Sequence, residues 1–298
     1  LLAGAIISGP LYLSSALLSI TEQVGSNAKG SYHHITFGDM AMLSALFMAS
    51  VLVVKDLSNA VKIILVISIL CLLYASILSQ ARGAWLALPF GALLLMVVAV
   101  RYGRIKIRTM AFAIVVILTL IVLSPAKDIL SGRILKAVHE IELFQSGEVA
   151  YSSVGSRLAM WHVATNVWKK FPILGTGPGD FREEFIASQE QGLYTDVGLY
   201  ASTHNIFFQA LSTTGTIGFI ILCAALFILP FRLFYRQYKR KMCVASVSGM
   251  VMLTSFAVFG LTESWTLRSP VISVYLLYFV TLATAISQET DADKPMAL

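Results

Sequence analysis

The chain has 298 residues, of which 57% are hydrophobic and 13% are charged, and its formal net charge is +6. A soluble domain carries about a quarter charged residues, so this composition excludes a water-soluble globule and indicates that lipid is the main solvent. In a membrane protein such positive charge is expected in cytoplasmic loops, so it does not indicate a nucleic-acid partner.

The three cysteines, Cys71, Cys223 and Cys243, lie within or beside apolar runs. We interpret them as small buried hydrophobic side chains, and we expect neither a disulfide framework nor a metal site. The chain begins inside an apolar run without an initiator methionine. We therefore expect a missing N-terminal part of the protein to precede it.

Apolar runs near the roughly 20 residues that a membrane span requires follow one another along the chain. They predict an all-α integral membrane protein, a multi-span helical bundle that forms one polytopic membrane domain over 1–298. The expected spans are 1–20, 37–54, 61–80, 83–100, 109–124, 203–230, 243–262 and 270–287. The one long connection between them is 125–202.

Lysine and arginine residues set the predicted orientation. The connections 101–108 and 231–242 are densely basic, and Lys55 and Lys62 flank the link between the second and third spans. With eight spans these three connections fall on one side, which the positive-inside rule makes cytoplasmic. The outer side then holds 21–36, 80–82, 262–269 and the large loop 125–202.

Two arginines lie on this predicted outer side. Arg82, in SILSQARGAWLAL, stands between two spans with almost no loop, where a guanidinium is costly unless it is paired or reaches the surface. Arg157 begins an amphipathic pattern with two tryptophans, which predicts a helix in the membrane interface with the arginine at its N-terminus. The alternative for Arg82 is an anchor in the membrane interface beside Trp85. The alternative for the segment that begins at Arg157 is an ordinary interface helix.

The stretch HNIFFQALSTTGTIGFI places a histidine at the start of a long span. We expect Ser202 or Thr203 to cap this helix and His204 to point into the bundle. The alternative is an interfacial histidine that is satisfied by water. The residues expected on one helical face are His204, Phe208, Leu211, Gly215 and Gly218.

Three other polar features receive structural interpretations. GTGPGDF at 175–181 lacks the context of a phosphate-binding loop, so we interpret it as a turn. His33 and His34 are adjacent and have no obvious third ligand, so zinc is not expected. Glu263 and Arg268 flank the last outer loop and can pair with each other.

The two arginines suit an anionic group, because guanidinium binds phosphate bidentately and stays charged at physiological pH. A diphosphate attached to a membrane lipid would fit Arg82 and Arg157. A nearby histidine, His204, could then accept a proton from an attacking hydroxyl.

The blocks SQARGAWLAL, GSRLAMW with GTGPGDF, and HNIFFQALSTTGTIGFI resemble the O-antigen ligase and O-antigen polymerase superfamily, over roughly residues 30–225. The resemblance implies a bacterial inner-membrane, multi-pass glycosyltransferase with a GT-C-like helical fold and a large periplasmic loop containing short interfacial helices. It also implies a glycan donor linked to undecaprenyl diphosphate, with no cofactor and no metal.

In O-antigen ligases the glycan passes to a sugar hydroxyl of the lipid A-core. By resemblance, Arg82 and Arg157 would hold the donor diphosphate, and His204 would act as base or orient the acceptor. KGSYHHITFGD resembles the first outer loop of the family, where arginine often replaces Lys29 and asparagine often replaces His34. These two residues are weaker candidates, as are Asn205 and Glu263.

Three other functions remain open. An O-antigen polymerase joins lipid-linked repeat units and shares the same motifs, and a protein O-oligosaccharyltransferase belongs to the same superfamily. A transporter would place its charges near the bilayer midplane, whereas those of this chain gather at the predicted outer surface.

Overall fold

The computed structural model describes residues 9–18, 33–106, 108, 126–145, 153–194 and 197–292. Within these ranges the regular structure is helical, without a strand, so the predicted all-α class is confirmed. Five helices are long and apolar enough to cross a membrane, which makes this a multi-pass membrane protein. They are His34–Val54, Asn59–Leu78, Arg82–Arg101, Ile206–Arg240 and Ser269–Glu289.

The other predicted spans have different outcomes. Two of them, 1–20 and 243–262, correspond to the shorter apolar helices Gly9–Leu18 and Val244–Phe259. The predicted span 109–124 lies outside the described residues.

Contacts divide the chain into two compact units, and each is described by itself. The first unit comprises Leu1–Arg104 with Ala224–Leu298, and the second comprises Ile105–Cys223. The single polytopic domain expected over 1–298, with its large outer loop, stays a prediction.

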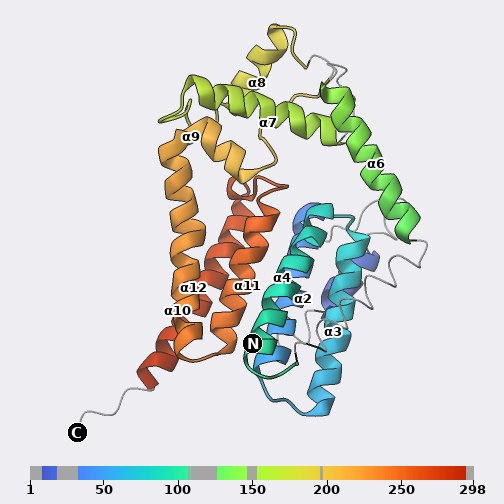
Figure 1. Cartoon of the computed structure of the whole chain (residues 1–298), viewed down its shortest axis with the longest axis vertical. Helices are drawn as coiled ribbons and strands as arrows, with labels where there is room; N and C mark the ends of the chain where they lie inside the picture. The colour runs from blue at the N-terminus through green and yellow to red at the C-terminus, as the bar shows by residue number, and fades with distance from the viewer. Residues whose placement is uncertain are drawn as a thin grey trace. The chain divides into compact units, whose positions relative to one another are not determined.

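In the first unit, helix α11 (Val244–Phe259) packs against several neighbours that surround it (Figure 1). Most of its residues are buried, and many are small, which allows helix backbones to approach closely within a membrane. Ser248 of α11 and Ser50 share a hydrogen bond of 2.5 Å. The neighbouring helices are α2 (His34–Val54), α4 (Arg82–Arg101), α10 (Leu229–Arg240) and α12 (Ser269–Ala292), and α3 (Asn59–Leu78) packs on α2.

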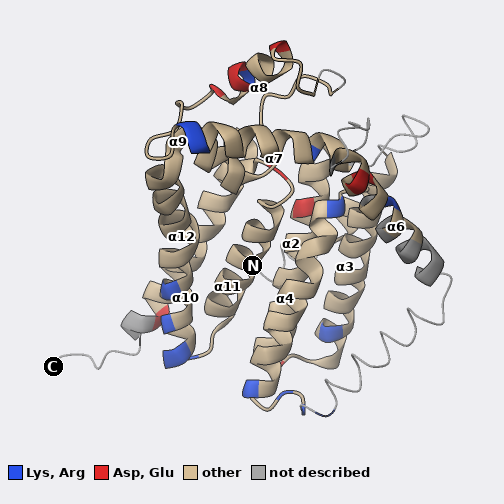
Figure 2. Ribbon diagram, turned by 45° about the horizontal axis from the view of Figure 1, so that its top comes forward, with Lys and Arg blue, Asp and Glu red and all other residues tan. Residues whose placement is uncertain are grey.

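The basic connections meet at one end of this unit. Arg104 forms a salt bridge with Asp56, and the hydrogen bond from its guanidinium lowers the pKa of that carboxyl. The Tyr102 hydroxyl donates to the Tyr238 carbonyl over 3.2 Å, which joins the ends of α4 and α10. Figure 2 shows Lys and Arg at these ends. The charge pattern thus gathers at one end, while the membrane side that this end faces stays a prediction.

One predicted boundary is wrong in this unit. The basic segment 231–242 was expected to be a loop, yet α10 stays helical to Arg240. Its apolar side chains Phe234 and Tyr238 are buried, while its basic ones remain exposed. The segment is therefore an amphipathic helical end, whose charges do not prevent packing of the opposite face.

In the second unit, helix α7 (Ser153–Lys170) contacts three other helices among the described residues (Figure 1). Its buried face carries Met160, Val163 and Val167, whose spacing of three and four residues forms one helical stripe. These residues pack with Phe181 and Phe185 of α8. The three partners of α7 are α6 (Ala126–Gln145), α8 (Phe181–Glu190) and α9 (Ile206–Cys223).

Candidate active site

The predicted site residues fall in both units. Arg82, His34 and Glu263 belong to the first unit, and Arg157, His204 and Asn205 belong to the second. Lys29 lies outside the described residues.

His204 does not lie in the first turn of its helix. It occupies a bend before α9, with a φ of +48°, in the left-handed region that non-glycine residues rarely adopt. Asn205 caps the helix, because its Oδ1 accepts the backbone N–H groups of Phe207 at 2.9 Å and Phe208 at 3.2 Å. The prediction that Ser202 or Thr203 caps the helix is therefore wrong.

The prediction that five residues from His204 to Gly218 share one helical face is also wrong. His204 precedes the helix, and Gly215 adopts φ 64° and ψ −168°, which interrupts it. A helical period cannot be continued across non-helical residues, so His204 does not share a face with Gly218.

A buried network holds the turn that carries His204. The Thr203 backbone N–H donates to Gln209 Oε1 over 3.0 Å. The side-chain Oγ1 of Thr203 donates to the Asn205 carbonyl over 2.6 Å. Thr203, Asn205 and Gln209 are all buried. Half-buried His204 itself lies edge-on to Tyr200, with ring centroids 6.1 Å apart. The neighbours on both sides of His204 thus fix its unusual backbone conformation.

The tryptophans of α7 reinforce this turn and the helix after it. Trp161 Nε1 donates to the Thr203 carbonyl over 3.1 Å, and its ring stacks on Phe208 at 5.3 Å. Trp168 Nε1 donates to Thr216 Oγ1 over 3.0 Å. The two tryptophans of α7 therefore pack on α9 and on the turn before it, because their indole N–H groups find protein acceptors there.

Arg157 lies one helical turn before Trp161 on α7, so the two side chains share a face. Because Trp161 contacts the residue before His204, the structure brings the Arg157 face of α7 toward the His204 turn. Arg157 was expected at the N-terminus of its helix. This prediction is wrong, because the helix begins at Ser153.

The segment GTGPGDF docks on the break in α9. The Thr176 and Gly177 N–H groups donate to the carbonyls of Ser212 at 3.2 Å and Thr213 at 2.9 Å. In return, the Thr216 N–H donates to the Pro172 carbonyl over 2.8 Å. The interpretation of this segment as a turn is confirmed, because two of its N–H groups satisfy the interrupted helix and are not free for a phosphate.

Glycine makes this docking possible. At Gly215, a Cβ would overlap the Ile173 carbonyl, and the positive φ already disfavours any other residue. Gly175 has a φ of +67° and approaches the backbone of Thr213 equally closely. The loop and the helix break therefore fit only with glycine at both positions.

In the first unit, Arg82 is the exposed first residue of α4. The next residue, Gly83, lies against Thr262, where a Cβ would overlap the threonine hydroxyl. Gly38 of α2 packs equally closely on Ser79, in the link that leads to Arg82. These contacts fix the backbone that presents the arginine.

The predicted pairing of Glu263 with Arg268 is confirmed at 3.2 Å. Glu263 is 3% exposed, and its Oε1 also accepts the Ser264 N–H at 3.0 Å. His34 is the first residue of α2, and the ring of His33 lies 4.3 Å from its ring. The salt bridge between Glu263 and Arg268 therefore lies within the connection that joins the end of α11 to the start of α12.

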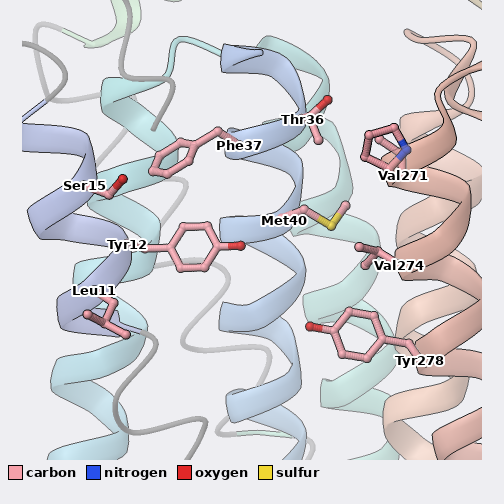
Figure 3. A pocket seen from close by; sticks show the side chains of 10 residues that line it. Leu11, Tyr12, Ser15, Thr36, Phe37, Met40, Val271, Val274 and Tyr278 are labelled. Atoms are coloured by element: carbon pink, nitrogen blue, oxygen red, sulfur yellow. The ribbon is translucent and has the colours of Figure 1, made fainter. Parts of the chain in front are cut away.

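An apolar cavity of about 470 Å³ lies in the first unit between Gly9–Leu18, α2 and α12. Figure 3 shows Tyr12 and Tyr278 projecting into it from different helices. The rest of its lining is largely apolar, so its chemistry suits a hydrocarbon chain.

Comparison with known sequences adds two findings. A sequence model of the family described as O-Antigen ligase matches residues 67–223, more than half of the chain. This range contains Arg82, Arg157 and His204. An uncharacterized protein of Haemophilus influenzae is 27% identical over 195 residues, which is 63% of this chain and 48% of the relative. The chain thus spans about half the length of that curated relative.

Proposed function

The chain belongs to the O-antigen ligase family, and on this premise we propose that it is a glycosyltransferase for lipid-linked glycans. Its donor is an O-antigen glycan on undecaprenyl diphosphate, and its acceptor is a sugar hydroxyl of the lipid A-core. The reaction takes place at the periplasmic face of the bacterial inner membrane. The charge pattern supports this orientation, because the basic connections gather at the opposite end of the first unit from Arg82.

The geometry of the His204 turn is the observation that carries this proposal. A polar residue in a rarely populated backbone conformation persists only when its surroundings enforce it, and such residues cluster at functional sites. Here the enforcing groups are the buried Thr203, Asn205 and Gln209, together with Trp161. The family match covers all of these positions.

In the proposed reaction, the guanidinium groups of Arg82 and Arg157 bind the donor diphosphate and balance its charge. The bond between the first glycan carbon and the diphosphate oxygen breaks, and the electron pair leaves with the diphosphate. A hydroxyl oxygen of the acceptor forms the new bond to that carbon. The proton of this hydroxyl passes to His204, which acts as general base. The arginines supply the positive charge, so the proposal includes no cofactor and no metal.

A polymerase that joins lipid-linked repeat units belongs to the same superfamily and uses a similar donor. Deletion of the gene, followed by separation of the lipids, distinguishes the two functions. The ligase proposal predicts long glycan that accumulates on undecaprenyl diphosphate, together with a lipid A-core that lacks it. A core that carries a single repeat unit would instead identify a polymerase. Complementation with Arg157→Lys should leave the donor stranded, whereas the unaltered gene should restore transfer.

A further inference from the structure

A π-helical turn, Ala224–Ile228, precedes α10 in the first unit. Such turns insert an extra residue into a helix, free a backbone carbonyl and occur frequently at functional sites. Here the Tyr275 hydroxyl donates a hydrogen bond to the Leu226 carbonyl. The widened turn is therefore stabilised by a side chain of α12.

A second cavity, of about 440 Å³, lies beside this turn, between α10 and α11. Phe227, Phe231 and Leu253 contribute large apolar walls. Thr254 and Ala257 of α11 also line it, one helical turn apart, and their small side chains leave space between the helices. The groove thus offers an apolar channel on the surface of the first unit.

Arg232 is the one charged residue in the lining of this groove. It is exposed, and within the described chain it has no carboxylate partner. Arg236, Lys239 and Arg240 follow at spacings of four, seven and eight residues, so they continue the same face of α10. An exposed arginine beside an apolar channel, with further cations toward the helix end, is complementary to an anionic headgroup that carries acyl chains.

We propose that this groove binds an anionic bilayer phospholipid, with its phosphate on Arg232 and an acyl chain along Phe231 and Phe227. The sequence of α10 sets the direction that we propose. Its basic end is expected at the headgroup level, so its π-helical end is expected deeper in the bilayer.

This lipid differs from the proposed glycan donor. The α10 end meets the end of α4 at Tyr102, whereas Arg82 is at the other end of α4. The phospholipid therefore belongs to the leaflet opposite the one that Arg82 faces. The proposal does not depend on the glycosyltransferase activity.

Native mass spectrometry of the purified protein, equilibrated with equal amounts of phosphatidylglycerol and phosphatidylethanolamine, tests this site. The unaltered protein should retain phosphatidylglycerol preferentially. Arg232→Gln should lower the ratio of retained phosphatidylglycerol to phosphatidylethanolamine about fivefold, the effect of losing one cation near an anionic lipid. The matched control Arg101→Gln removes an exposed cation from the last turn of α4, outside the groove, and should leave the ratio unchanged.

A second variant tests the groove without changing charge. Ala257→Trp should fill the channel and reduce retention of both lipids, while binding of undecaprenyl phosphate should persist in both groove variants. The proposal is overturned if neither variant changes retention. It is equally overturned if Arg101→Gln lowers the ratio as much as Arg232→Gln, because surface charge alone would then explain the preference.

Discussion

The indole N–H of Trp161 donates a 3.1 Å hydrogen bond to the Thr203 carbonyl, so helix α7 is joined directly to the residue before His204. Because Arg157 lies one turn earlier on α7, one rigid element connects the proposed phosphate-binding arginine to the proposed base. Such a connection keeps reacting groups at a fixed separation, which a flexible loop could not do.

Asn205 is predicted to act through the helix cap and not through chemistry. Asn205→Ala removes the acceptor of the Phe207 and Phe208 N–H groups and should lower stability by about 1 kcal/mol. Asn205→Asp keeps this acceptor and should retain stability. Thermal unfolding of the purified variants in one detergent compares them. Equal melting temperatures for Asn205→Ala and the unaltered protein would refute the cap.

Gly215→Ala should destabilise the second unit by about 1–3 kcal/mol, because the alanine Cβ meets the Ile173 carbonyl and the backbone has a positive φ. Gly132→Ala is the matched control, since no atom lies within 4 Å of the added Cβ. It should be neutral or slightly stabilising within α6. Thermal unfolding and the yield of folded protein measure both. A harmless Gly215→Ala would mean that the break in α9 does not require glycine.

Asn205 and Gly215 also show which features could not be predicted from the sequence. Length and apolar composition predicted the five long apolar helices, because both follow from the thickness of the bilayer. Ser202 and Thr203 were the expected caps, however, and only the structure shows that Asn205 caps the helix. The break at Gly215 depends on the loop at 172–177, which pairs with it from a distance in sequence. No local pattern encodes such a partner.

Other site residues show the same difference between local features, which the sequence predicts, and packing partners, which it does not. The Glu263–Arg268 pair was predictable, because both charges flank one short loop. The tryptophan spacing of α7 predicted an aromatic face, yet periodicity does not identify what covers that face, and α9 does.

Arg157→Lys and Arg82→Lys should each lose most transfer activity at unchanged protein levels. Lysine keeps the charge but lacks the planar fork that binds phosphate bidentately. Complementation of a deletion strain, with protein levels measured by immunoblot, provides the comparison. Arg182→Lys exchanges an exposed side chain of α8, so it serves as the control and should retain activity. Full activity in both site variants would reduce the two arginines to membrane anchors.

The orientation can be tested with single cysteines in a background without Cys71, Cys223 and Cys243. Glu190→Cys should react with an impermeant thiol reagent applied from the periplasmic side, and Ile105→Cys should react only after the membrane is opened. Both side chains are exposed, so accessibility within the protein does not limit the reaction. The reverse labelling pattern would place the proposed site on the cytoplasmic side.

Reconstituted transfer tests the central claim most directly. The protein is placed in liposomes with a glycan on undecaprenyl diphosphate and with lipid A-core, and products are resolved by mass spectrometry. The unaltered protein should form glycan-bearing lipid A-core and release undecaprenyl diphosphate. His204→Ala should lower the rate by about 10²–10⁴-fold while donor binding persists, and His139→Ala, on exposed α6, should have no effect. Undiminished transfer by His204→Ala, or growth of the lipid-linked glycan with no product on lipid A-core, would contradict the account.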